Sequence, residues 1–294
     1  MNILAKSVLL VFLTAIASAA IAESDSAIVT LGHPLLNNTW EFWAGGFFPS
    51  VDSEVRIDSS MGSPGDGIDL EDDFGLDDGK TVLWGGARWH FLTRHLVEIE
   101  VANLNRSATV GGTTREWDIG DNTYRAGARI DSEFDLALIR ATYGYSIFRR
   151  PKHELSLKAG FHMTHTRIAI RGFGDVANVD TGQPVCNPSP CEVEAESSDF
   201  TIPLPHLGAA YGYGFTPKLA LRSQLLLFAI EINDIKGTLA EVDLDLIYRP
   251  WEHVAFGAGI RYFKVTVEDK RNAFLRGEFE YEYKGPVLYV MGSF

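Results

Sequence analysis

Long apolar runs and basic residues are both scarce in this 294-residue chain. After the N-terminal segment, the longest apolar run is 225–230, which is far shorter than the roughly 20 residues of a spanning helix, so the body of the chain has no predicted transmembrane helix. Lys and Arg number 26 against 39 Asp and Glu, a net charge of −13. A nucleic-acid-binding role needs a basic surface and is therefore excluded.

Residues 1–22 are typical of a signal for Sec-type export. Lys6 supplies the positive charge, 8–16 form a short apolar segment, and Ala20 and Ala22 form a small-residue cleavage site. The alternative, an N-terminal membrane anchor, is too short. We predict that 1–22 is removed, that 23–37 is a periplasmic N-terminal segment, and that 38–294 carries the fold.

Cysteine is also rare. The only two, Cys186 and Cys191, enclose Asn-Pro-Ser-Pro, and in an exported chain this spacing favours a disulfide that shapes a loop. Cys-x4-Cys without a nearby histidine pair is a poor zinc signature. No cofactor is predicted.

The remaining sequence alternates between apolar and polar residues with period two. Between 137 and 147 the odd positions are apolar, whereas Arg140, Thr142, Gly144 and Ser146 stand between them. This pattern predicts strands, and short turns alternate along the chain with long polar connections, giving about ten antiparallel strands. Counts of eight or twelve also fit strands that span in about 9–11 residues. The expected spans are 38–48, 81–92, 95–104, 126–148, 152–171, 200–215, 218–232, 236–249, 253–268 and 276–294. Residues 53–59, in the connection 49–80, either extend the first strand or form an extra strand.

The apolar faces can pack on each other in a soluble sandwich or face lipid in a membrane barrel. Three features favour lipid: an apolar final strand ending in Phe294, large charges of both signs in mid-strand on the polar face, and aromatic residues beside the short turns, as in an interfacial girdle. The aromatic residues are Trp40, Phe42, Trp89, Phe91, Tyr143, Tyr145, Tyr211, Tyr213, Phe215 and Tyr248.

With its export signal, alternating short and long connections and the ending 288–294, the chain resembles Gram-negative outer-membrane β-barrels of the small OmpA/OmpW-like type. The resemblance covers 38–294 and is architectural, so it brings no catalytic residues. It implies an all-β, transmembrane, antiparallel up-and-down barrel in the cell outer membrane, surrounded by lipid and lipopolysaccharide. It also implies that the assembly machinery reads Phe294, although Gly292 stands where many members have an aromatic residue. Gly285-Pro286 interrupts the last strand and predicts a bulge or an edge position.

Ten charged residues are expected to line the lumen: Arg88, Glu98, Glu100, Arg140, Lys158, Arg222, Glu241, Asp243, Asp245 and Arg261. Because a lone charge in a narrow lumen is costly, ion pairing that fills the barrel is one interpretation. A narrow pore for small solutes is the alternative.

Two further charged groups are candidate sites. Seven carboxylates fall within 66–78, of which Asp69, Asp72 and Asp73 are candidate Ca²⁺ ligands, although the spacing is not that of an EF-hand and a solvated acidic loop is the alternative. Arg129, Arg167 and Arg171 are candidate ligands for lipid phosphates. If the turn at 149–152 pairs residues whose numbers sum to about 301, the three arginines lie together, but nearby carboxylates favour ordinary cross-strand ion pairs.

An enzyme is a further alternative, because some barrels that resemble this one hydrolyse lipids with Ser-His pairs. His165 is the histidine best placed for this, but no serine is expected across from it and Gly-x-Ser-x-Gly is absent. The sequence thus favours a non-enzymatic, monomeric barrel with a structural or surface-interaction role.

Overall fold

A computed structural model describes residues 33–232, 235–269 and 277–294. The predicted signal peptide and most of the predicted periplasmic segment lie outside these residues. The unit that starts at Gly32 contains every described strand. No helix in the described part of the chain is long and apolar enough to cross a membrane.

The strands form two sheets. The larger contains β1 (Trp40–Phe47), β2 (Ser50–Ile57), β3 (Gly67–Asp69), β4 (Val82–Leu92), β5 (His95–Val110), β8 (Arg129–Arg149), β9 (His153–Gly174), β11 (Cys191–Thr216), β12 (Leu219–Ile232), β13 (Ile235–Tyr248), β14 (Val254–Asp269) and β15 (Gly277–Ser293). The smaller contains β6 (Trp117–Ile119), β7 (Asn122–Tyr124) and β10 (Val176–Asn178).

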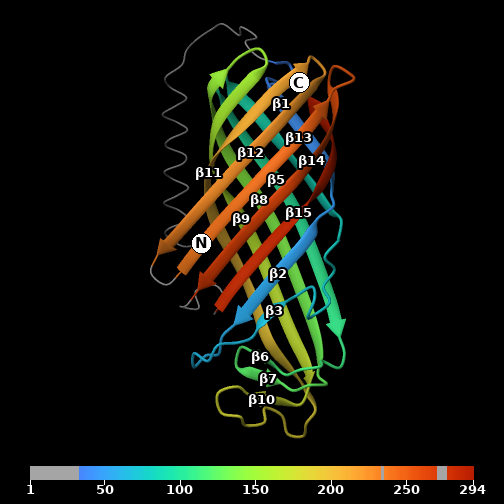
Figure 1. Ribbon diagram of the computed structural model, residues 1–294, viewed down its shortest axis with the longest axis vertical. Helices are drawn as coiled ribbons and strands as arrows, with labels where there is room; N and C mark the ends of the chain where they lie inside the picture. The colour runs from blue at the N-terminus through green and yellow to red at the C-terminus, as the bar shows by residue number, and fades with distance from the viewer. Residues whose placement is uncertain (1–32, 233–234, 270–276) are drawn as a thin grey trace. The chain divides into compact units, whose positions relative to one another are not determined.

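The larger sheet closes into a barrel because β1 pairs with both β4 and β15. β15 continues past β1 to pair with β2, so β1 and β2 act as one interrupted strand. The barrel wall therefore has ten strands, which we call staves, with β1 and β2 together counted as one. Figure 1 shows the tilted staves, with the smaller sheet at the end opposite the chain's C-terminus. The predicted all-β, ten-strand antiparallel barrel is confirmed.

Four tight connections, near 93–94, 150–152, 217–218 and 249–253, lie at one end, which we call the short-turn end. The other is the long-loop end. Several strands extend further toward it than predicted: β5 reaches Val110, β11 begins at Cys191, and β2 and β3 lie within the predicted connection 49–80. The predicted strand ends there were wrong because the two-residue alternation continues, but the outward positions change from apolar to polar.

The polarity change occurs on every stave. Toward the short-turn end the outward side chains are apolar and exposed, including Phe42, Leu83, Ile99, Val101, Ile139, Leu157, Leu207, Leu225, Leu227, Val242, Leu244, Leu246, Phe256, Ile260, Leu288 and Val290. Toward the long-loop end the outward row becomes polar, beginning at Ser50, Thr81, Asn103, Asp135, His165, Thr201, Glu231, Thr238, Tyr262 and Lys284. Such an apolar belt suits hydrocarbon, and the polar continuation suits water.

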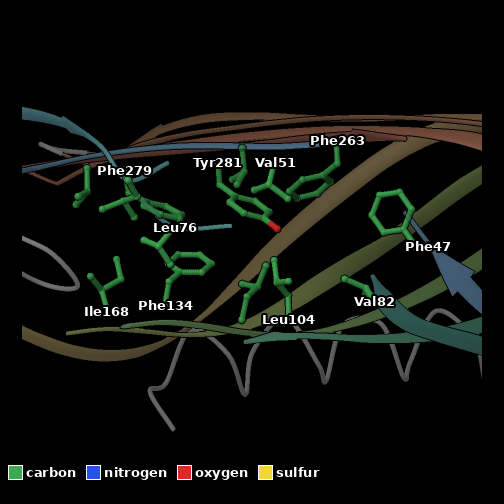
Figure 2. Packing of buried hydrophobic residues seen from close by; sticks show 14 of the residues in the cluster. Phe47, Val51, Leu76, Val82, Leu104, Phe134, Ile168, Phe263, Phe279 and Tyr281 are labelled. Atoms are coloured by element: carbon green, nitrogen blue, oxygen red, sulfur yellow. The ribbon is translucent and has the colours of Figure 1, made fainter. Parts of the chain in front are cut away.

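Inside the barrel the order is reversed. Where the outer wall is apolar, the inner face carries the buried charges, beside apolar side chains such as Trp43, Tyr289 and Met291. Where the outer wall is polar, the inner face is apolar. Phe134, Ile168, Phe263, Phe279 and Tyr281 meet in the long-loop half, as Figure 2 shows. Phe134 stacks on Tyr281 with ring centroids 5.6 Å apart. The long-loop half is thus built like a water-soluble barrel with its own hydrophobic core.

The interruption at Gly285-Pro286 has a different form from the one predicted. β15 runs through both residues in register with β14, and the break falls on its other neighbour, between β1 and β2. Phe48 N donates to Pro286 O at 3.0 Å and holds the two sides of the break together.

The outer boundary of the apolar belt predicts two unequal effects on β13. Leu244→Arg, in the middle of the belt, is expected to lower the free energy of unfolding by about 2–4 kcal/mol, because a guanidinium would face hydrocarbon. Thr238→Arg, on the same face but beyond the belt, is expected to cost about 0–1 kcal/mol. Denaturant titration in lipid vesicles measures both. Equal costs would contradict the position of the boundary.

Candidate functional site

The inner face of the apolar belt carries a network of buried charges. Six carboxylates (Glu41, Glu98, Glu100, Glu241, Asp243, Asp245) and five basic groups (Arg88, Arg140, Lys158, Arg222, Arg261) project into the lumen from eight strands. The strands place them there because each residue occupies the inward position of a period-two alternation. All ten predicted lumen residues belong to this network.

Arg140 is the centre of the network. Its side chain is 5% exposed and forms ion pairs with Glu98 at 3.1 Å, with Asp243 at 3.2 Å, and with Glu100 and Glu241. Four carboxylates on two strands thus converge on one guanidinium, whose fixed geometry suits several charged partners at once.

A second cluster links the first stave to the network. Glu41 is fully buried and accepts hydrogen bonds from Arg88 at 2.9 Å and from Arg222 at 2.5 and 2.8 Å. Arg88 also pairs with Glu98 at 2.5 Å. Glu41 was missed in the sequence, although it stands between the outward aromatic residues Trp40 and Phe42 and so occupies an inward position.

A chain of hydrogen bonds borders the network on the side of the long loops. His162 Nε2 lies 2.6 Å from Glu241 Oε2, the Nδ1 atoms of His162 and His206 lie 3.1 Å apart, and Thr142 Oγ1 lies 3.1 Å from His206 Nε2. Both histidines are buried. One tautomer of each ring satisfies every contact, with His162 donating to Glu241 and Thr142 donating to His206.

Among the described residues, two of the small cavities lie beside the lumen charges. One, of about 80 Å³, lies among the charges and is lined by Arg88, Lys158 and Asp245. The other, of about 50 Å³, lies between the charges and the apolar core and is lined by Glu100, Leu104 and Tyr283. Each has room for a few water molecules.

Residues 33–36 close the short-turn end of the lumen. Leu35 and Leu36 are buried, and Arg222 donates to Leu35 O. The His33 ring lies so close to Gly214 that a Cβ there would come within 2.0 Å of it, so glycine is needed at this position. Leu35 N donates to His33 Nδ1 at 3.3 Å, and His33 Nε2 lies 2.7 Å from Thr216 O.

The acidic loop 66–78 has a buried apolar side. Ile68, Leu70, Phe74 and Leu76 are 0–3% exposed and cover the core, and Phe74 meets Trp117 edge-on at 5.3 Å. Glu71 accepts hydrogen bonds from Ser53 Oγ at 2.6 Å and from the buried Arg106. The loop is therefore a lid as well as an acidic surface.

The candidate Ca²⁺ ligands participate in the turn of this lid. Asp69 Oδ1 accepts from the backbone N of Glu71 at 3.0 Å and of Asp72 at 2.7 Å, and Asp73 Oδ2 accepts from Asp69 N at 3.1 Å. Among the described residues, no three His, Cys, Asp or Glu side chains are grouped as a metal site would require. Calcium binding by Asp69, Asp72 and Asp73 stays a prediction.

The three arginines lie on the outer wall of the long-loop half. Arg171 pairs with Glu133 at 2.7 Å and Arg129 with Asp131 at 3.2 Å, and Arg167 lies opposite Asp135. The predicted register was wrong by one residue: the paired numbers sum to 303 beside the turn and to 302 beyond an irregularity between Ser146 and Phe148. This shift puts arginine and carboxylate on the same face.

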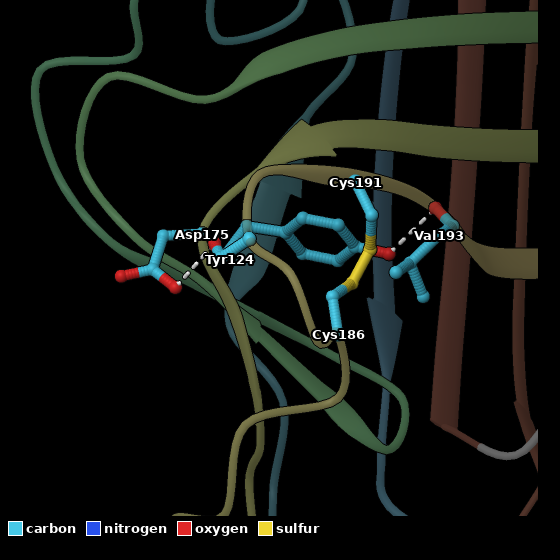
Figure 3. Close-up of a disulfide and its surroundings, with 6 residues drawn as sticks. Tyr124, Asp175, Cys186, Cys191 and Val193 are labelled. Carbon is cyan, nitrogen blue, oxygen red and sulfur yellow. Dashed lines mark hydrogen bonds between the residues drawn. A yellow bond between two sulfur atoms is a disulfide. The ribbon is translucent and has the colours of Figure 1, made fainter.

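Cys186 and Cys191 form the predicted disulfide, with Cα atoms 6.1 Å apart. Figure 3 shows it beside the Tyr124 ring, whose hydroxyl donates to Val193 O at 3.0 Å. Burial raises the pKa of Tyr124, so this hydroxyl keeps its proton. The disulfide loop is thus anchored to the smaller sheet through β7.

His165, the candidate histidine for an enzyme, lies on the outer wall. Its Nδ1 is 3.1 Å from Thr201 Oγ1 and 3.5 Å from Asp199, and it pairs across the strands with Thr201 and Ala137. As the sequence predicts, no serine lies across from it.

Phe294, the predicted assembly signal, exchanges backbone hydrogen bonds with Trp40 and stacks on His253 at 5.2 Å.

The buried network predicts a large cost for removing one carboxylate. Glu98→Gln leaves Arg88, Arg140 and Lys158 with one fewer counter-charge and is expected to lower the free energy of unfolding by about 3–5 kcal/mol. Glu133→Gln removes an exposed ion pair and is expected to cost about 0–1 kcal/mol. Denaturant titration of both variants tests this, and similar small costs would show that the lumen charges are well solvated.

The docking of 33–36 is expected to weaken in acid. Burial lowers the pKa of His33, and Arg249, Arg222 and Lys152 add repulsion toward its protonated form. Because the folded pKa lies below the unfolded value of about 6.5, docking is fully stabilised above that pH and is lost as the pH falls through the folded pKa. Hydrogen exchange of amides 33–38, corrected for intrinsic rates, should show this loss. His33→Asn should remove the pH dependence, and a pH-independent wild type would contradict the argument.

The comparisons with known proteins concern the fold. No protein-family model matches the chain, and no curated protein matches its sequence. The outer membrane protease OmpT from Escherichia coli is structurally similar, with a TM-score of 0.51, 10% identity and coverage of 87% of this chain and 96% of that one. The Pseudomonas aeruginosa outer membrane protein OprG matches with 15% identity over 89% and 95% of the chains and a TM-score of 0.30. The Ralstonia pickettii toluene transporter TbuX matches with 11% identity over 92% of each chain and a TM-score of 0.33. The similarity to OmpT shows that the chain has the fold of an outer-membrane β-barrel, whereas the OmpA/OmpW-like type stays a prediction.

Proposed function

We propose that this protein is an integral outer-membrane barrel with a filled lumen, whose role is to hold an ordered surface platform at the long-loop end. The observation that carries the proposal is the two-layer filling of the barrel. A charged layer with ion pairs on Arg140 is followed along the axis by the apolar layer around Phe134 and Tyr281. A solute would have to displace both layers.

The platform supports an interaction role because hydrogen bonds to the barrel and to the smaller sheet hold its loops in place. The lid 66–78 is tied to β2 by Ser53 and Glu71, and the disulfide loop is tied to β7 by Tyr124. Ordered loops on a rigid scaffold are common carriers of binding function. In this proposal the outer wall contacts lipid and lipopolysaccharide. Arg129, Arg167 and Arg171 are candidate phosphate ligands there, and Phe294 is the feature read by the assembly machinery.

Single-channel recording tests the filled lumen. The mature chain, refolded in planar lipid bilayers, is expected to give no stepwise openings, because side chains occupy the lumen in both layers. Heat-dependent migration on gels establishes that the protein is folded, and an open porin in the same bilayer checks detection.

A narrow solute channel is the alternative that this experiment addresses. Reproducible openings whose conductance changes in Arg140→Gln or Asp243→Asn would overturn the filled barrel and make the charged layer a selectivity filter. Openings unaffected by either variant would also overturn it, and would place the path outside the charge network.

A further inference from the structure

The barrel wall is incompletely hydrogen-bonded at the long-loop end. β4 pairs with β5 only as far as Trp84 opposite Ala102, while β8 continues alongside β5 to Val110. On the other side of the opening, the larger sheet ends at β2 and the short β3. β4 itself begins at Val82, level with Leu104, so residues 105–110 of β5 have a strand neighbour on one side only.

The backbone groups on the open side can be identified from the register. Ser146 N donates to Arg94 O, and Gly112 N donates to Ala128 O, so even-numbered residues of β5 and its extensions bond toward β8 from one end of the ladder to the other. In an antiparallel strand the N–H and C=O of one residue point to the same side and alternate along the strand. The odd-numbered residues Asn105, Ser107 and Thr109, which lie beyond the end of β4, therefore present their N–H and C=O to the opening.

The two edges of the opening are not equivalent. The edge of β2 is covered by the lid: Leu70 N donates to Ser53 O, and Val51 N donates to Asp78 O, both at 2.9 Å. On β5, Lys80 Nζ donates to Asn105 O. Within the described residues, the N–H groups of Asn105, Ser107 and Thr109 make no hydrogen bond. A row of open donors and acceptors on a fixed strand is a template for an added strand.

The surroundings of this edge are acidic on both flanks. Asp77 and Asp78 of the lid are exposed on one side. On the other, a shallow groove over β5, β8, β9 and β11 is lined by Asp131, Glu133, Glu192 and Arg171. Arg171 pairs with Glu133 and Arg129 pairs with Asp131, so three carboxylates face two guanidinium groups there. The β5 side chains between the flanks, such as Ser107 and Thr109, are exposed, small and uncharged.

We propose that the 105–109 edge of β5 binds an extended, cationic segment of another polypeptide as an added β-strand. The backbone of β5 supplies the hydrogen bonds, and the flanking carboxylates select Lys and Arg side chains. A second copy of this chain does not fit, because pairing two such edges would bring the acidic flanks together. This inference deepens the proposed surface-interaction role and rests on it, but its test does not involve conductance, so either can fail alone.

The first experiment measures binding to the full mature chain in nanodiscs. A fluorescent heptapeptide of alternating Lys and Thr is titrated and followed by anisotropy, beside the same peptide with Glu in place of Lys. Saturable binding of the cationic peptide only is expected. Equal binding of both peptides would overturn the proposed selectivity, and concentration-dependent self-association that blocks the peptide would assign the edge to a second copy.

The second experiment removes one edge donor. Ser107→Pro deletes an N–H that faces the opening without removing a bond to β8, and proline is tolerated on strand edges. It should weaken binding roughly tenfold, whereas Ser107→Ala, which keeps the N–H, should bind as the wild type does. Unchanged affinity in a folded Ser107→Pro variant would overturn the added strand.

A peptide-side test covers the case in which Ser107→Pro does not fold. Methylating alternate backbone nitrogens of the Lys-Thr peptide, in each of the two registers, should abolish binding in one register and spare it in the other. Loss of binding in both registers, or in neither, would overturn strand addition.

The carboxylates are tested separately. Asp131→Asn combined with Glu133→Gln should weaken binding and flatten its salt dependence, because screened attraction between charges is removed.

Discussion

The structure depends on one constraint: each stave of a single closed sheet passes from hydrocarbon into water. A strand presents alternate side chains to its two faces, so the same row of side chains faces outward on both sides of the boundary between hydrocarbon and water. The residue type in that row has to change at the boundary instead. Outward residues turn from apolar to polar at the same level around the barrel, and inward residues turn from charged to apolar. The backbone can continue through this boundary because neighbouring strands satisfy its N–H and C=O groups in the hydrocarbon half as well as in the water-exposed half.

The two interiors follow from this constraint. In the half inside the apolar belt, the outer wall has taken the apolar side chains, and the narrow lumen is filled by charges that compensate one another around Arg140. Each of these charges needs an oppositely charged partner nearby, because a buried charge without partners costs several kcal/mol. In the half beyond the belt, water covers the outer wall, and the ordinary hydrophobic effect gathers Phe134, Phe263 and Tyr281 inside. The lid 66–78 completes this second core where the β-sheet itself does not close.

Much of the barrel could be predicted from local pattern. The strand count, the inward positions of all ten predicted charges and the disulfide between Cys186 and Cys191 depend on alternation and spacing, which are properties of short segments. Three features could not be predicted in this way. Glu41 was missed because one carboxylate in a short, aromatic-rich stave does not form a visible pattern. The register between β8 and β9 was wrong by one residue because the turn is centred later than predicted and an irregularity at Ser146 and Phe148 then shifts the pairing back by one residue. Both depend on how the hairpin fits the barrel. The strand ends at 110 and 191 were missed because inverted polarity was interpreted as a loop.

The sequence by itself determined which residues share a face of each strand, since a period of two is fixed by the pleat of the backbone. It also determined that the chain forms strands and not helices. Only the tertiary structure decided which charges meet on Arg140, since those contacts join strands far apart in sequence. It likewise decided that the 105–109 edge of β5 stays open, because an edge is defined by the absence of a neighbouring strand. No local pattern records where a distant strand ends.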